Sequence, residues 1–74
     1  MNFGRANLSR ANLCATSIRS AYFNFVNLNE ANLNGADLEG AALAAANLKG
    51  ANLRKASLGG ARLREANRPG PKRF

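Results

Sequence analysis

The chain has no histidine, and its only cysteine is Cys14. Its four acidic residues are Glu30, Asp37, Glu39 and Glu65. These scarcities remove the side chains that most often serve as general bases, nucleophiles and zinc ligands. The acids between positions 30 and 39 have no histidine or cysteine nearby to complete a metal site. We therefore expect no enzyme, no metal and no cofactor.

Long hydrophobic runs are also missing, although 46% of the residues are hydrophobic. A transmembrane helix or the apolar region of a signal peptide needs a continuous apolar block, and the apolar residues here are always interrupted. We therefore expect no membrane association and a cytoplasmic location.

What the chain has instead is a five-residue repeat with no gaps. A large apolar residue, which we call the centre of its pentad, recurs at every fifth position. The centres are Phe3, Leu8, Leu13, Ile18, Phe23, Leu28, Leu33, Leu38, Leu43, Leu48, Leu53, Leu58 and Leu63. The residue two before each centre is mostly alanine, and the residue directly before it is commonly asparagine.

A period of five fits neither a helix nor a flat strand. A helix would scatter the centres over all of its faces, and a flat strand would turn alternate centres to opposite faces. If each pentad is one short extended side followed by a corner, each centre and the residue two before it point to one axis. The sequence therefore predicts a solenoid.

The pattern Ala-(Asn/Asp)-Leu-x-x resembles that of the pentapeptide repeat family. Examples are residues 6–8, 11–13, 31–33, 36–38, 46–48 and 51–53. The resemblance implies an all-β fold, a right-handed quadrilateral β-helix with four pentads per coil. It implies a little over three coils over residues 1–67 and no catalytic residues. Residues 68–74 depart from the pattern and are expected to form a basic tail containing proline and glycine.

With twenty residues per coil, residues twenty apart should stack on one another. Phe3 then lies beside Phe23, and asparagines fall beside asparagines. Opposite charges also meet, because Arg10 is twenty residues from Glu30 and Arg19 is twenty from Glu39. The second coil thus forms an acidic band between basic ones.

Two recurring residue types are expected to serve the turns. Asparagine side chains bond readily to nearby turn backbone, so we interpret the asparagine column as structural and not as a recognition surface. Gly35, Gly40, Gly50 and Gly60 fall two residues after a centre, where a corner can require positive φ. No phosphate-binding loop is expected, since no helix or Lys-Ser/Thr pair follows these glycines.

The N-terminal end of the array has no evident cap, because the five-residue repeat already begins at Met1. Terminal units of a solenoid ordinarily need caps. Either the chain is part of a longer array, or it covers an open end by forming a homodimer. At the other end, Pro69 and Pro71 break the pattern, and two interpretations stay open. The prolines can stop edge-to-edge stacking of the solenoid and be followed by a disordered tail. Alternatively, the tail folds back so that Phe74 packs over the exposed coil of Leu63 or into a partner.

The net charge of +7 separates three classes of function. The resemblance includes topoisomerase inhibitors that imitate DNA with an acidic surface, and a basic chain does not suit that role. Direct but weak nucleic-acid binding is the alternative. Its candidate contacts are Lys49, Arg54, Lys55, Arg62, Arg64, Arg68, Lys72 and Arg73. No aromatic residues alternate with these basic ones, so the simpler interpretation is that they are exposed, solvated side chains without a specific ligand.

The leading hypothesis is a non-catalytic scaffold that binds an unidentified protein. In the expected fold, one side is unusually apolar. Its outward residues include Tyr22, Phe25, Ala42, Ala44 and Ala45. A contiguous apolar patch of this kind often marks a partner surface, although single exposed apolar side chains are normal and Phe25 can simply stack on Arg5.

Overall fold

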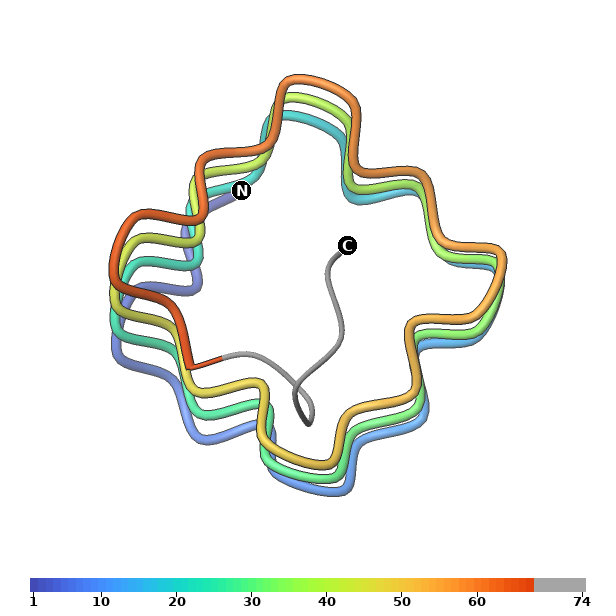
Figure 1. The fold of residues 1–74 in the computed structure, drawn as a ribbon, viewed down its shortest axis with the longest axis horizontal. Helices are drawn as coiled ribbons and strands as arrows, with labels where there is room; N and C mark the ends of the chain where they lie inside the picture. Colours follow the sequence, from blue (N-terminus) through green and yellow to red (C-terminus); the bar gives the residue numbers. More distant parts are fainter. Residues whose placement is uncertain (68–74) are drawn as a thin grey trace.

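The computed structural model describes residues 1–67, which wind into stacked turns with a roughly four-sided outline (Figure 1). Parallel bridges join residues twenty apart, from Asn2 with Tyr22 to Asn47 with Asn67. Within residues 1–67 each extended segment is a single bridge residue, and no helix forms. Residues twenty apart therefore occupy equivalent places in successive turns. We call residues 1–20, 21–40 and 41–60 coils 1, 2 and 3; residues 61–67 begin the next coil.

The coils are held together by backbone hydrogen bonds that repeat in every pentad. In the pentad centred on Leu28, the Leu28 amide donates to the Asn47 carbonyl at 2.8 Å, and the Glu30 amide donates to the Lys49 carbonyl at 2.8 Å. In the reverse direction, the Asn47 amide donates to the Val26 carbonyl at 2.9 Å. The ladder gives most backbone groups in the middle coil a hydrogen-bond partner, although each extended segment is short.

The core lies along the axis and is best sealed in the middle of the described chain. The centres from Ile18 to Leu48 are buried, as are the small residues from Ala21 to Ala51. The centres of the outermost pentads are only partly buried. Phe3 and Phe23 stack as predicted, with ring centroids 5.0 Å apart and an interplanar angle of 9°. The hydrophobic contribution is therefore concentrated in coil 2 and the parts of its neighbours that touch it.

Each corner is a tight turn that starts at a centre. The Ala31 amide, for example, donates to the Leu28 carbonyl at 3.0 Å, three residues back. The residue two after the centre has positive φ, as at the third position of a type II turn. The prediction for Gly35, Gly40, Gly50 and Gly60 is confirmed, since their φ values are 70–72°. Nine other residues that the sequence did not single out share this conformation, with φ of 57–62°.

The corner conformation leads to a first prediction at Gly35. A Cβ added there would lie 3.9 Å from Ala15, an ordinary contact, so the cost of substitution comes from the backbone and not from crowding. Gly35→Val should destabilise the chain by about 1–3 kcal/mol, because β-branched residues strongly disfavour positive φ. Gly35→Asn should cost less than about 1 kcal/mol, because asparagine tolerates this region. Urea unfolding followed by circular dichroism measures both; equal losses would contradict the assignment of strain.

Candidate interaction surfaces

One side of the solenoid carries the apolar residues that the sequence singled out. This side is built from residues 1–5, 21–25, 41–45 and 61–65. Tyr22 and Phe25 are 57% and 55% exposed, and Ala42, Ala44 and Ala45 are half-buried. Bridges from Tyr22 to Ala42 and from Ala42 to Arg62 place these coils side by side. We call Tyr22, Phe25, Ala42, Ala44 and Ala45 the aromatic face.

Part of the aromatic face is covered by a neighbouring coil. The guanidinium carbon of Arg5 lies 4.7 Å from the centroid of the Phe25 ring. This cation–π contact was anticipated from the twenty-residue spacing and covers one side of the ring. More than half of the Phe25 side chain nevertheless stays in contact with solvent. The contact therefore orients the ring without removing it from the surface.

The same side has a hydrogen bond that the sequence analysis missed. The amide of Ala44 donates to Oδ1 of Asn24, one coil earlier, at 3.2 Å. In pentads that have asparagine in this column, such as those of Asn47 and Asn52, the equivalent amide bonds to the asparagine two residues before it, but Ala42 has no acceptor in its side chain. Asn24 supplies the missing acceptor from the adjacent coil. The signal was the combination of an alanine in the asparagine column and an asparagine twenty residues before the affected amide.

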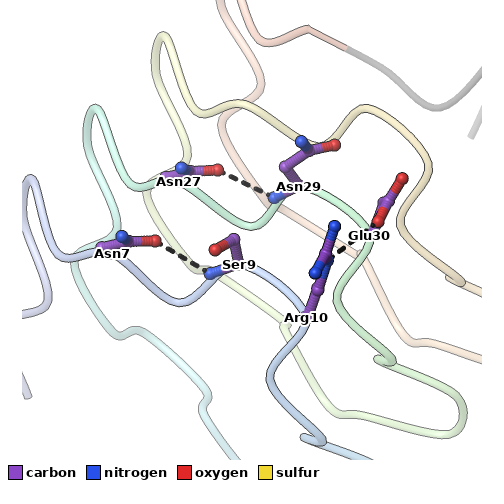
Figure 2. A network of polar contacts seen from close by, with 6 residues as sticks. All are labelled: Asn7, Ser9, Arg10, Asn27, Asn29 and Glu30. Atoms are coloured by element: carbon purple, nitrogen blue, oxygen red, sulfur yellow. Dashed lines mark hydrogen bonds and ion pairs between the residues drawn. The ribbon is translucent and has the colours of Figure 1, made fainter.

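The asparagine column serves the turns, as predicted. Oδ1 of Asn7 accepts from the Ser9 amide at 3.2 Å, and Oδ1 of Asn27 accepts from the Asn29 amide at 3.0 Å (Figure 2). The same bond, from the amide two residues on, recurs at Asn2, Asn12, Asn32, Asp37, Asn47 and Asn52. Because these oxygens already accept backbone donors, they offer less to an external ligand.

Ion pairs between coils 1 and 2 use the acidic band. Arg10 Nε lies 3.2 Å from a carboxylate oxygen of Glu30 (Figure 2). Arg19 contacts two carboxylates, with Nε 3.0 Å from Asp37 and a terminal nitrogen on Glu39. The pairs of Arg10 with Glu30 and Arg19 with Glu39 were predicted; the contribution of Asp37 was not, because it was assigned only to the turn column. Both arginines are largely exposed, so the pairs add little stability.

The carboxylates around Arg19 shift the pKa of its guanidinium. The hydrogen bond to Glu39, followed by the charge of Asp37, raises the pKa of the Arg19 guanidinium. An arginine side chain is always charged in proteins, and these contacts favour the charged form further. The positive charge of Arg19 therefore partly balances the negative charges of Asp37 and Glu39 on this side of coil 2.

The positive charge is therefore segregated along the chain. Residues 1–40 contain three arginines and three acids, so their net charge is zero. Residues 41–67 contain five basic residues and one acid, a net charge of +4. The predicted contacts within this part are Lys49, Arg54, Lys55, Arg62 and Arg64, which are all exposed. They lie on three sides of the solenoid. The remaining three, Arg68, Lys72 and Arg73, and the predicted tail itself lie outside the described residues.

The described residues show no other chemically suggestive cluster. Across residues 1–67 no group of three histidine, cysteine, aspartate or glutamate side chains is placed to hold a metal ion. In the same part of the chain, no helix has the length and hydropathy to cross a bilayer. Cys14, the only cysteine of the chain, is an exposed free thiol.

The repeat is matched by a known family. A family model described as pentapeptide repeats (8 copies) matches two overlapping stretches of the chain, residues 2–35 and 31–67. The chain belongs to the pentapeptide repeat family. A search of curated proteins gave no match.

Solved structures of pentapeptide repeat proteins are similar to this chain. Rfr23 from the cyanobacterium Cyanothece 51142 is 32% identical, with a TM-score of 0.54 over 82% of this chain and 48% of its own. HetL from Nostoc sp. strain PCC 7120, a protein involved in heterocyst differentiation regulation, is 30% identical over 99% of this chain and 43% of its own, with a TM-score of 0.40. The chain alr5209 from Nostoc PCC 7120 is 34% identical over 99% and 76%, with a TM-score of 0.37. This pentapeptide repeat chain thus spans about half the length of the first two.

Proposed function

We propose that this chain is a non-catalytic, cytoplasmic scaffold that binds another protein through the aromatic face. The scaffold is taken to be a right-handed quadrilateral β-helix of a little over three coils, the architecture of its family. The observation that supports the proposal most is the exposure of Tyr22 and Phe25 on one side, next to half-buried alanines. Aromatic side chains that lie on a rigid apolar surface are the usual anchors of protein interfaces.

The test of this proposal removes the aromatic anchors and leaves the rest of the surface intact. The double variant Y22S/F25S should retain the fold, because both side chains are largely exposed. Binding of captured host proteins, quantified by mass spectrometry of pull-downs, should fall more than about tenfold, since each aromatic anchor contributes about 2 kcal/mol or more. The matched control is N29A/N34A, on two other sides of the same coil. Unchanged capture by Y22S/F25S would overturn the proposal.

The same preparation tests whether the chain forms a homodimer through an open end of the solenoid. Sedimentation velocity over a range of protein concentrations should show a concentration-dependent shift from monomer to dimer if two copies cover an end. A single monomeric species throughout that range would rule this arrangement out.

The second candidate function is weak nucleic-acid binding, which the segregation of charge favours. Residues 41–67 carry a net charge of +4, whereas residues 1–40 have a net charge of zero. The positive electrostatic potential is therefore concentrated at one end of the described chain. The anisotropy of a labelled random DNA duplex should then report binding at about 50 mM salt and a loss of roughly a thousandfold at about 200 mM. Binding that is absent at low salt would remove this candidate.

Imitation of DNA is the function that these surfaces support least. Such a protein needs an acidic surface to resemble phosphate, and the acids of coil 2 are paired with Arg10 and Arg19. The described residues beyond coil 2 contain one further acid, Glu65.

A further inference from the structure

The side that carries the aromatic face changes character from coil to coil along the axis. Coil 1 contributes Arg5, coil 2 Tyr22 and Phe25, and coil 3 a platform of three alanines; residues 61–65 then add Arg62 and Arg64. The Leu43 amide donates to the Arg62 carbonyl at 2.7 Å, and the Ala45 amide donates to the Arg64 carbonyl at 2.8 Å. Neighbouring coils pair like strands, about 4.8 Å apart. The backbone that carries these two arginines therefore borders the alanine platform and lies two coil spacings, about 10 Å, from the backbone of the aromatic residues.

The charged border differs from the arginines of coil 1. Arg10 and Arg19 are paired with acids of coil 2, and Arg5 lies over Phe25. Arg62 and Arg64 are exposed, and within residues 1–67 neither makes an ion pair. The acid nearest to them in sequence, Glu65, follows Arg64 in the turn that starts at Leu63, and it forms no ion pair with either arginine within residues 1–67. Unpaired guanidinium groups beside an apolar surface suit carboxylates, which they can bind with two parallel hydrogen bonds.

We propose that the occupant of the aromatic face is an acidic segment of another protein that carries an aliphatic or aromatic anchor. This inference rests on the proposed function and names the chemistry of the partner. The anchor packs against Tyr22, Phe25 and the alanine platform, and carboxylates on one side of it contact Arg62 and Arg64. Charge complementarity supports this occupant over a second copy of the chain, since two such faces would oppose arginines to arginines.

The experiment selects ligands from a displayed library of random twelve-residue peptides on the immobilised full chain. Peptides that also bind Y22S/F25S are subtracted. The remaining peptides should combine an apolar anchor with at least two acidic residues and carry a net negative charge. Affinities of the selected peptides are then measured for two charge variants. R62Q/R64Q should weaken binding on the order of tenfold, and R54Q/K55Q, which loses the same charge on another side, should change it less than about twofold.

The outcomes separate this inference from the proposed function. Selected peptides that are neutral or basic, equal losses in the two charge variants, or a library that yields no peptide dependent on Tyr22 and Phe25 would each overturn the acidic partner. Acidic peptides that bind equally well without an apolar residue would also overturn it, because they would report a purely electrostatic site. If Y22S/F25S still loses its captured proteins in any of these cases, the scaffold function stands and only the partner chemistry is wrong.

Discussion

Leu33→Ala should destabilise this chain by about 2–5 kcal/mol, the usual cost of truncating a fully buried leucine. Leu33 is completely buried in coil 2, between the alanine columns of the core. Small domains have roughly 5–15 kcal/mol of stability in total, so the variant should unfold at much lower urea concentrations. Circular dichroism during urea titration measures the loss.

The matched control for this variant is Leu63→Ala. Leu63 occupies the same position in its pentad but is only partly buried near the end of the described chain. Its truncation should cost less than about 2 kcal/mol, because less apolar surface is returned to water. A loss at Leu63 as large as that at Leu33 would show that the core is not concentrated in the middle coil.

Ala31→Leu should destabilise the chain by overfilling the same core. Ala31 is buried, and its neighbours in the column, Ala11 and Ala51, are also alanine, so no larger side chain is accommodated there. Overpacking typically costs about 1–3 kcal/mol. For a chain of this size, that corresponds to a fall in Tm of about 4–8 °C for each kcal/mol.

The control for overpacking uses the same column one coil earlier. Ala11 is partly exposed in coil 1, where a leucine can turn toward solvent. Ala11→Leu should change Tm by less than half as much as Ala31→Leu in a thermal melt. The account of the alanine column is wrong if the two substitutions are equally tolerated.

The stacking of this fold was predictable from the sequence because each inward position repeats at a fixed spacing. The period of five placed the centres on the axis, and the resemblance added the twenty-residue coil. Together they predicted the stack of Phe3 on Phe23 and the pair of Arg10 with Glu30. These features depend only on which residues lie beside one another in neighbouring coils, and the short repeat determines that alignment almost completely.

Features that depend on local backbone or on compensation between coils were not predictable in the same way. Positive φ at Phe25 and Ala45 has no residue signature, since the fold imposes the turn on side chains that do not favour it. The bond from the Ala44 amide to Asn24 appears only when two neighbouring coils are compared. Tyr22 and Phe25 are exposed and the three alanines beside them are half-buried, but periodicity carries no information about what binds these positions.

The twenty-residue coil is the claim on which the aromatic face, the ion pairs and the segregation of charge all depend. Cys14 offers a direct test. In a twenty-residue coil, position 34 lies next to Cys14, as the hydrogen bond from the Ala15 amide to the Asn34 carbonyl at 2.8 Å shows. Adjacent strand positions, about 4.8 Å apart, fall within the Cα separation of about 4.4–6.8 Å that a disulfide spans.

The measurement is the formation of an intramolecular disulfide in Asn34→Cys under mild oxidation, detected by mass spectrometry of the monomer without reductant. Asn29→Cys, which shifts the new cysteine by one pentad to another side, is the control. The account predicts rapid closure between Cys14 and position 34 and none with position 29. Closure with position 29, or failure of position 34 to close while the variant remains folded, would contradict the twenty-residue coil.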